Sequence, residues 1–435
     1  MADRRLNALS LKGAASRREF LRQGATAAAA TALAANVFSP RMAHAAGDDT
    51  LRVGLIGCGG RGLGAAADAL GADKNLKIFA LADAFPDRVV AAREQLRRSG
   101  GERVDLADER CFHGFDAYKQ LIDIKEIDVV LLTTPPHFRP MHYQYAIEKG
   151  KHTFVEKPVA VDAPGYRSVL TTNEMAKQKG LAVVSGLCWR YDLGVRETMK
   201  RVLDGAIGDI VTIQENYNAG FLWHRGRKPG WSEMEYQMRN WLYFTWLSGD
   251  HNVEQHVHSL DKASWLMGDK PPLRATGLGG RQVRTDEKWG NIFDHHAVVY
   301  EYPNGVKLFA FCRQQDGTST DTEDYFMGTR GRCEVLKHAI TGGMNWSYSG
   351  PKPNMYSVEH QELYASIRAG KPIYNGDYMA TSSMLAIMGR MATYTGQEVT
   401  WDQAFNSKQN LAPESYAWGP APEIEIALPG VTKLI

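Results

Sequence analysis

The chain has 435 residues, and 51 Lys and Arg stand against 49 Asp and Glu, which gives a formal net charge of +2. At about 100–200 residues per domain, this length indicates two or three domains. The near-neutral charge argues against nucleic acid as the main partner, and an aromatic content of 10% excludes a disordered chain. The five cysteines form no Cys-x-x-Cys pair, which argues against a disulfide scaffold and a structural zinc site.

The first 45 residues have the layout of a secretory signal. The pair Arg17-Arg18, followed by Phe20 and Leu21, precedes an apolar run built mostly from alanine, and the small-residue site Ala43-His44-Ala45 comes after it. Paired arginines before Phe-Leu resemble a twin-arginine signal, which exports folded proteins. We therefore expect cleavage after residue 45 and a protein exported to the periplasm or secreted, without stable membrane insertion. The alternative is a disordered basic leader.

Loss of this leader changes the charge of the protein. Residues 1–45 contain seven basic and two acidic residues, so 44 basic and 47 acidic residues are left. The expected mature chain is therefore mildly acidic, with a formal charge of about −3, which strengthens the case against nucleic acid.

A dinucleotide fingerprint opens the next part of the chain. An apolar strand at 51–56 runs into Gly57-Cys58-Gly59-Gly60-Arg61-Gly62, and a helix is expected over 64–70. In this strand-to-helix setting, Gly57 permits the turn, Gly59 lets the backbone approach a pyrophosphate, and Gly62 allows close packing of helix and strand. The predicted cofactor contacts here are Gly57, Gly59, Gly60, Arg61 and Gly62.

An acidic residue follows at the expected distance. A second strand, 76–82, ends at Asp83, 21 residues after Gly62. Such an acid binds the ribose hydroxyls and favours NAD over NADP, because a carboxylate repels the 2′-phosphate. Arg88 is near enough to keep NADP open, and an exposed turn residue is the alternative interpretation of Asp83.

Further apolar runs at 127–133, 151–155 and 181–185 alternate with helical patterns and predict a doubly wound parallel sheet. Ligands bind beyond the carboxyl ends of such strands. Thr134-Pro135 follows the first of these runs and Glu156-Lys157-Pro158 the second, so both segments are expected on the cofactor side.

These motifs together resemble the glucose–fructose oxidoreductase/inositol dehydrogenase (Gfo/Idh/MocA) family. The resemblance implies an α/β fold with an N-terminal Rossmann domain, 46–185, and a C-terminal α+β domain, 186–435, that has a large, mostly antiparallel open sheet. It implies NAD as the cofactor, with NADP possible, and cofactor contacts from Thr134, Pro135, His137, Glu156 and Lys157. Because little free dinucleotide is present outside the cytoplasm, export implies that this cofactor is tightly bound. One departure is Arg139, which stands where the family usually has His.

The second half contains strand-like runs at 209–217, 273–281, 296–302 and 306–312, with a hairpin turn at Pro303-Asn304-Gly305. We expect one packed sheet face and one face open to the substrate, through which homo-oligomers also form. The runs 356–370 and 378–395 are expected to be helical, and the resemblance implies that the second packs back on the first domain.

A tryptophan-rich segment, 221–258, is a candidate for sugar binding because aromatic faces stack on the C–H faces of sugars. Core packing or an oligomer contact is the alternative. Its first part, 221–240, has the composition of a loop that can act as a lid. The predicted substrate contacts in this half are Arg190, Tyr191, Trp223, Trp241, His256, Asp261 and His296.

The catalytic candidates lie in Gly249–Asp261. By resemblance, His258 matches the family's catalytic His, and Glu254 replaces its Asp. On one helix these two residues share a face, so Glu254 is expected to orient His258 or share its proton. His258 is the expected proton acceptor, and Lys157 is expected to hold the reacting hydroxyl. We expect no metal; a site of His251, His256, His258 and Glu254 is the alternative.

The leading hypothesis is an exported NAD(P)-dependent oxidoreductase acting on a sugar or cyclic polyol. The second is an NAD-dependent glycoside hydrolase that oxidises its substrate transiently, eliminates the aglycone, adds water and reduces the ketone again. The third is a non-catalytic sugar or dinucleotide sensor, against which the presence of both Lys157 and His258 counts.

Overall fold

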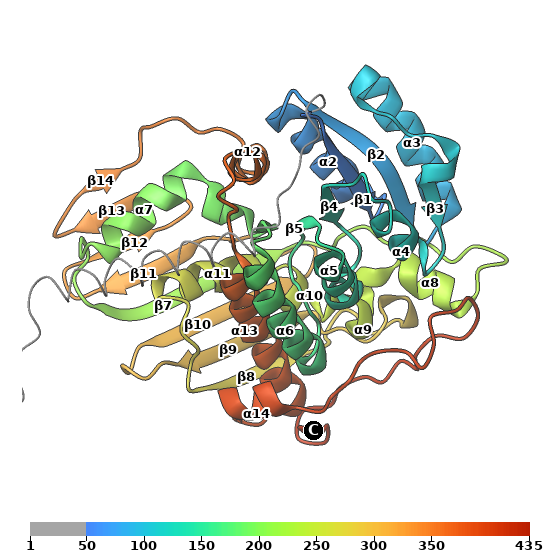
Figure 1. Ribbon diagram of the computed structural model, residues 1–435. Coiled ribbons are helices and arrows are strands. Elements are labelled where there is room, and N and C mark those ends of the chain that lie inside the picture. Colours follow the sequence, from blue (N-terminus) through green and yellow to red (C-terminus); the bar gives the residue numbers. More distant parts are fainter. Residues whose placement is uncertain (1–48) are drawn as a thin grey trace, which may run out of the picture. The chain divides into compact units, whose positions relative to one another are not determined.

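The computed structural model describes residues 49–435, of which Thr50–Ile435 form one compact unit. The predicted signal and its cleavage point lie outside the described residues. Two sheets organise this unit (Figure 1). Among residues 49–435, none of the helices combines the length and the apolar character needed to cross a bilayer.

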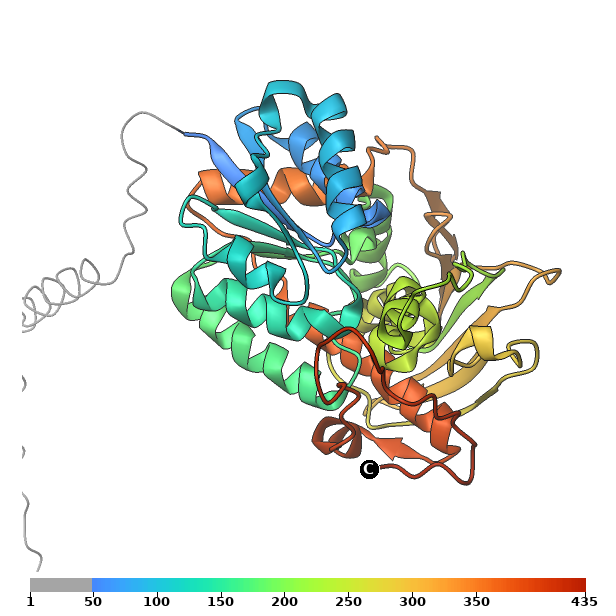
Figure 2. The same ribbon diagram turned by 90° about the vertical axis from the view of Figure 1, so that its right-hand side faces the viewer.

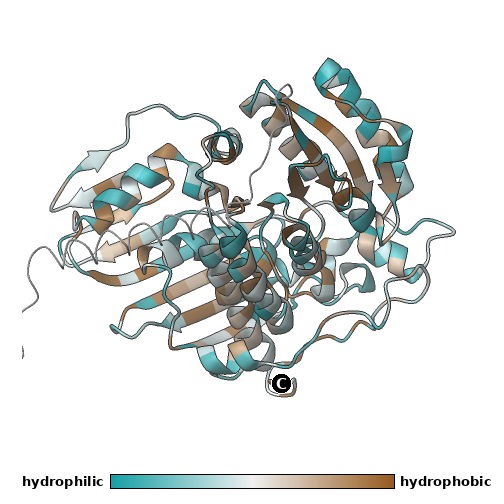
Figure 3. Ribbon diagram, viewed as in Figure 1, coloured by the Kyte–Doolittle hydropathy of each residue, from teal (hydrophilic) through white to brown (hydrophobic). Residues whose placement is uncertain are grey.

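The first sheet has six parallel strands in the order β3-β2-β1-β4-β5-β6, as predicted for a doubly wound fold. Its central strands are apolar on both faces, because helices cover both sides of a parallel sheet, and Figure 3 shows this apolar character along β1 and β2. The strands are β1 Leu51–Ile56, β2 Leu76–Asp83, β3 Cys111–His113, β4 Val129–Leu132, β5 His152–Val155 and β6 Val183–Ser185.

The helices between these strands begin and end at recognisable signals. In the longest of them, α6, the Asp162 side chain accepts a hydrogen bond from the Gly165 amide at 2.8 Å, and Gly180 ends the helix in the left-handed conformation. The helices of this part are α2 Gly60–Ala72, α3 Pro86–Gly100, α4 Ala117–Ile122, α5 Arg139–Glu148 and α6 Ala163–Lys179.

The second sheet is mixed, with nine strands in the order β14-β13-β12-β11-β7-β10-β9-β8-β15. All pairs are antiparallel except β7 with β10, so the predicted mostly antiparallel sheet is confirmed. Residues 324–347 add four strands that the sequence analysis missed. The strands are β7 Ile210–Ala219, β8 Arg274–Gly280, β9 His295–Glu301, β10 Lys307–Gln314, β11 Asp324–Gly328, β12 Gly331–Glu334, β13 Ala339–Gly342, β14 Trp346–Ser347 and β15 Val399–Thr400.

One face of the second sheet is packed by helices and the other is uncovered. Along β9 and β10 every second side chain is buried, which is the pattern of a half-covered sheet. Helices α11 and α13 lie on the buried face (Figure 1). The helices of this part are α7 Leu193–Leu203, α8 Glu233–Arg239, α9 Thr245–Ser248, α10 His251–Glu254, α11 Val257–Leu266, α12 Met355–Arg368, α13 Gly376–Thr395 and α14 Trp401–Asn406.

The two C-terminal helices join the sheets. Helix α12 packs on α2, and α13 lies between α6 and β8. On α13, the Ser383 hydroxyl accepts a hydrogen bond from the Val159 amide at 3.0 Å, and the Asn173 side chain donates to the Gly376 carbonyl at 2.7 Å. Helix α13 therefore packs back on the first sheet's helices, as the resemblance implied.

The C-terminal segment, residues 407–435, was not anticipated. It leaves α14, passes beside α8 and returns, so that the Ile435 carbonyl accepts hydrogen bonds from the Ser407 hydroxyl and the Lys408 amide. Figure 2 shows this dark red segment running past α8. The Gly419 carbonyl accepts from the Met234 amide at 3.0 Å, which fixes the two segments to each other.

Candidate active site

A cavity of about 800 Å³ lies where the carboxyl ends of β1, β2, β4 and β5 face α10 and α11. This is the edge at which doubly wound sheets bind ligands. Because Asp83 ends β2 and Lys157 follows β5, the cleft extends across the sheet from Asp83 to Lys157. From the second sheet only the β7 residue Tyr217 lines it, on the helix-covered face. The expectation that the open sheet face meets the substrate is therefore wrong for this cavity.

The glycine loop is shaped for close backbone approach. Gly57 has φ +100°, and a Cβ there would lie 2.7 Å from the Thr133 carbonyl carbon. A Cβ at Gly62 would collide with the Gly57 carbonyl oxygen. The first turn of α2 has no side-chain cap and no acidic residue, so its free amides and dipole favour an anion. These residues fit a pyrophosphate.

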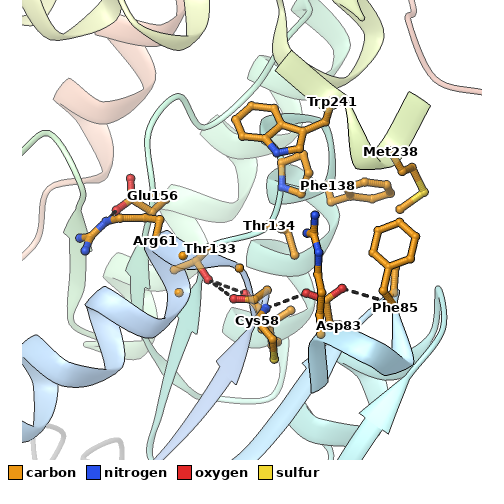
Figure 4. Close-up of a pocket in the computed structure, with 18 of the residues that line it drawn as sticks. Cys58, Arg61, Asp83, Phe85, Thr133, Thr134, Phe138, Glu156, Met238 and Trp241 are labelled. Atoms are coloured by element: carbon orange, nitrogen blue, oxygen red, sulfur yellow. Dashed lines mark hydrogen bonds and ion pairs between the residues drawn. The ribbon is translucent and has the colours of Figure 1, made fainter. Parts of the chain in front are cut away.

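Two backbone amides hold the Asp83 carboxylate in place, one at each oxygen (Figure 4). Its Oδ2 accepts from the Cys58 amide at 2.7 Å, and its Oδ1 accepts from the Phe85 amide at 3.0 Å. Burial raises the pKa of Asp83 although Arg88 opposes the shift. The alternative of an exposed turn residue is wrong, because the side chain is only 7% exposed. Each carboxylate oxygen keeps a lone pair for a ribose hydroxyl.

Arg61 and Glu156 form an ion pair in the wall of the cleft, on the side away from Asp83 (Figure 4). The Arg61 guanidinium also reaches Glu359 on α12 at 3.0 Å. Burial disfavours the charged Glu156, but Arg61, Arg139 and Lys157 outweigh it and hold its pKa below the ordinary value. Both predicted residues line the cavity, and their mutual pairing connects the glycine loop to the end of β5.

Arg139, which stands where the resembled family usually has His, has a structural role. Its guanidinium donates to the Pro158 carbonyl at 2.5 Å and to the Thr134 carbonyl at 2.7 Å. Burial lowers its pKa to about 10, so it is charged at neutral pH. Arg139 therefore holds the Thr134-Pro135 and Glu156-Lys157-Pro158 segments together.

Lys157 contacts the second half of the chain. Its Nζ donates to the Glu254 carbonyl at 2.6 Å and to the Glu254 carboxylate at 2.8 Å. Both side chains are largely buried, at 13% and 11% exposed. The Lys157 ammonium and the Glu254 carboxylate thus lie together at the end of the cleft opposite Asp83.

His258 lines the cavity beside this pair. Burial, reinforced by Lys157 and Lys262, holds the pKa of its imidazole well below the ordinary value. Its Nδ1 is buried without a hydrogen-bond partner among the described residues. A neutral imidazole at this position can accept a proton.

The expected pairing of Glu254 with His258 is wrong. Helix α10 ends at Glu254 and α11 begins at Val257, so the two residues do not share one helical face. The carboxylate of Glu254 bonds Lys157 instead. Gln255 and His256 form a turn between the two short helices, so the four-residue spacing does not place both side chains on one helix.

His137 does not line the cavity, which corrects its assignment as a cofactor contact. Its imidazole is buried, and its Nε2 shares a hydrogen bond of 2.8 Å with the Tyr416 hydroxyl. Burial lowers its pKa to about 4. His137 therefore anchors the C-terminal segment.

Five predicted substrate contacts have structural partners instead. Arg190 pairs with Asp261 at 2.9 Å and with Asp269 at 2.6 Å. The Tyr191 hydroxyl donates to Asn375 at 2.6 Å, and His256 shares a hydrogen bond with Asn252. These assignments are wrong because the side chains are buried away from the cavity: Arg190, Tyr191, His256, Asp261 and His296.

Trp223 and Trp241 do line the cavity, but their segment lies over its Asp83 end. From the same insertion, Arg239 makes a double hydrogen bond to Asp87, at 2.9 and 3.1 Å, and lies 4.1 Å from the Phe85 ring. Figure 4 shows Trp241 and Met238 facing Phe138 and Phe85 across the cleft. Part of the expected loop is the helix α8.

The sequence analysis missed three cavity residues near Lys157, namely Tyr217, Gln255 and Tyr356. Tyr217 lies near the end of β7, where alternation points it to the same face as the buried Ile213 and Glu215, a signal that the sequence carried. Gln255 accepts from the Gln314 amide at 2.6 Å, and Tyr356 stacks on Arg61. These two contacts come from distant segments and have no local signal.

The Arg190 pairing makes a prediction. Arg190→Met should lower the free energy of unfolding by about 3–5 kcal/mol, because it leaves buried Asp261 without its cation. Arg98→Met, which breaks an exposed pair with Glu94, should cost under about 1 kcal/mol. Urea unfolding measures both. If Arg190→Met left the free energy of unfolding unchanged and raised KM, Arg190 would be a substrate contact and not a structural ion-pair residue.

Comparisons with known proteins agree with this geometry. Residues 51–187 match the model of the GFO_IDH_MocA group, described as an oxidoreductase family with an NAD-binding Rossmann fold. A 2,7-anhydro-N-acetylneuraminate hydratase of Escherichia coli K12 is 26% identical over 52% of this chain and 55% of its own length. A glycosyl hydrolase family 109 protein of Bacteroides fragilis is 28% identical over 39% of this chain and 35% of its own. The chain thus spans about half, or less, of these relatives.

The fold also matches solved structures. A levoglucosan dehydrogenase, solved with NADH and levoglucosan, superposes with a TM-score of 0.64 at 17% identity, covering 81% of this chain and 99% of that one. The glycine loop, Asp83 and the strand-end residues all fall inside the matched range 51–187. In that range the chain has a Rossmann fold and matches the model of the Gfo/Idh/MocA oxidoreductases.

Proposed function

We propose that the protein is a nicotinamide-dependent enzyme that oxidises a hydroxyl group of a sugar or cyclic polyol. The observation that carries this proposal is the placement of Lys157, Glu254 and neutral His258 at one end of a cleft whose other end has the glycine loop and Asp83. The matched Rossmann family and the fold shared with a sugar dehydrogenase support it.

The chain's residues divide the work along the cleft. The α2 amides bind the pyrophosphate and Asp83 binds ribose hydroxyls. The bound nicotinamide supplies the hydride acceptor. The Lys157 ammonium holds the reacting oxygen and stabilises negative charge on it. His258 takes the hydroxyl proton, and Glu254 positions Lys157. Tyr217 and Gln255 are left to bind substrate hydroxyls.

A second candidate function is glycoside hydrolysis through transient oxidation. The similarity to a glycosyl hydrolase family 109 protein favours it. The same residues would serve, because the oxidation and the later reduction use one proton acceptor and one oxygen-binding cation. Net redox chemistry distinguishes the two candidates.

We also propose that the protein is exported, as its first 45 residues suggest, and that it associates through the uncovered sheet face. Leu278 is an apolar residue on the uncovered face of β8 and is 78% exposed. Export implies little free cofactor, so the dinucleotide should stay bound between turnovers, with NAD favoured by Asp83.

A single-turnover assay tests the proposed function. The purified protein is mixed with aldoses, inositols and aryl glycosides, and absorbance at 340 nm and free aglycone are recorded. Reduction of bound cofactor by a free sugar supports the oxidoreductase, whereas aglycone release without net reduction supports the hydrolase. Activity that survives in both Lys157→Met and His258→Gln would contradict both.

The pKa of His258 predicts a pH profile. A neutral imidazole is needed as proton acceptor, and its pKa lies well below 6.5. The rate of hydroxyl oxidation should therefore stay level from pH 8 to 6.5 and fall only in more acidic solution. His258→Gln should lower the rate by about 10²–10⁴-fold and remove this acid limb, whereas His113→Gln, on the exposed end of β3, should change neither.

The insertion and the C-terminal segment pack beside the Asp83 end of the cleft, and we expect them to slow dissociation of the dinucleotide. We call residues 221–244 and 407–435 the clasp. The Trp418 ring packs at a tilt against Phe85 and Phe115, with ring centroids at 5.3 and 4.7 Å, and both phenylalanines line the Asp83 end of the cleft. Arg239 covers Phe85 from the insertion.

Arg239→Ala combined with Trp418→Ala should raise the dinucleotide dissociation rate by roughly tenfold, which corresponds to ~1.4 kcal/mol. Stopped-flow displacement measures this rate. Trp346→Ala, on the remote strand β14, serves as the control. Equal dissociation rates in the double variant and the parent would show that the clasp does not retain the cofactor.

A further inference from the structure

Three buried side chains converge outside the cavity, where α10 begins against β9. Asp250, His251 and His296 are at most 3% exposed. One ligand atom from each lies within 4.8 Å of the others. The Asp250 Oδ1 is 3.2 Å from the His296 Nε2 and 3.8 Å from the His251 Nε2.

Apart from their contacts with one another, these three atoms have no hydrogen-bond partner among the described residues. Buried polar atoms in folded proteins are nearly always paired, because an unpaired one costs about 1–3 kcal/mol. Three such atoms aimed at one point indicate that something satisfies them together.

The hydrogen bonding of His296 shows which of its two ring nitrogens is left for the cluster. Its Nδ1 lies 2.8 Å from the Thr393 hydroxyl, and that hydroxyl donates to the Gly389 and Arg390 carbonyls of its own helix. Thr393 therefore accepts from the Nδ1–H. The His296 Nε2 is therefore the nitrogen left to face the Asp250 Oδ1, and a metal ion between these two atoms would satisfy both.

The backbone at Asp250 presents the carboxylate to this point. Asp250 has φ +83°, which an aspartate adopts only when its surroundings enforce it. Its Oδ2 accepts from the Phe293 amide at 2.9 Å and from the Tyr394 hydroxyl at 2.6 Å. This pairing leaves Oδ1 for the two imidazoles.

We propose that Asp250, His251 and His296 bind a divalent transition-metal ion of the Zn²⁺ type. Two imidazole nitrogens and one carboxylate oxygen are a donor set that this class of ion prefers, at about 2.0–2.2 Å from the metal. This set differs from the alternative that the sequence suggested, since His256 bonds Asn252 and His258 faces the cavity.

The charges around the site admit such an ion. Arg284 is fully buried nearby, where Asp250 and Asp294 both interact with it. Its guanidinium donates to the Phe293 carbonyl and to the Gln314 side chain, not to the Asp250 carboxylate, so the Asp250 Oδ1 remains for the metal. The ion would tie the first residue of α10 to β9 and so fix the helix that ends at Glu254. The proposal does not depend on the proposed function.

Elemental analysis of the full-length protein, purified without chelators, tests the proposal. We expect about one zinc or similar ion per chain, and Co²⁺ added after chelator treatment should give d–d absorption bands. His296→Gln and Asp250→Asn should each weaken Co²⁺ binding by about tenfold or more. His360→Gln, a buried imidazole stacked on Phe154, should leave it unchanged.

The Co²⁺ titration is also done on the protein without substitutions, so it measures metal binding even if a variant does not fold. Absence of metal in the purified protein together with absence of Co²⁺ binding would overturn the proposal. So would ¹⁵N NMR signals showing both nitrogens of His296 protonated, because a buried imidazolium–aspartate pair would then satisfy the cluster without a metal.

Discussion

The ion pair between Lys157 and Glu254 sets the geometry on which the proposed chemistry depends. Lys157 follows a strand of the parallel sheet, and Glu254 ends α10, a helix that packs on α13. A largely buried charge must be paired, and removing one partner of such a pair costs several kcal/mol. The Lys157 ammonium also bonds the Glu254 backbone carbonyl, so the end of α10 is held as well as its side chain. His258, four residues on, is thereby kept beside the cation.

Other buried charges extend this constraint across the cleft. Arg61 joins the glycine loop to Glu156 and to Glu359 on α12, and Arg139 bonds the carbonyls of Thr134 and Pro158. Each guanidinium connects segments that are distant in sequence. Because planar, multiply bonded arginines fix orientation as well as distance, the phosphate-binding loop and the Lys157 end are held in one geometry before any ligand binds.

The parallel sheet was predictable because its signals are local. The glycine pattern, Asp83 and the strand-end Pro residues each follow a short apolar strand, and their context fixes which edge they occupy. Second-half residues were harder. His296 and Arg190 have residue types typical of sugar sites, yet each is buried and bonds a residue of another element, Thr393 and Asp261 respectively. Glu254 and His258 are four apart, but a turn at Gln255 separates their helices. The clasp depends on contacts such as Trp418 with Phe85, which join positions more than 300 residues apart and leave no periodic pattern.

The central claim is that the cleft from Asp83 to Lys157 binds a nicotinamide dinucleotide tightly enough to keep it. The most direct measurement is to denature the purified protein and quantify the released nucleotide by absorbance and mass. The account predicts about one NAD or NADP per chain, or stoichiometric binding when the dinucleotide is added to the folded protein. Release of none, together with no binding by the folded protein in calorimetric titration, would contradict it.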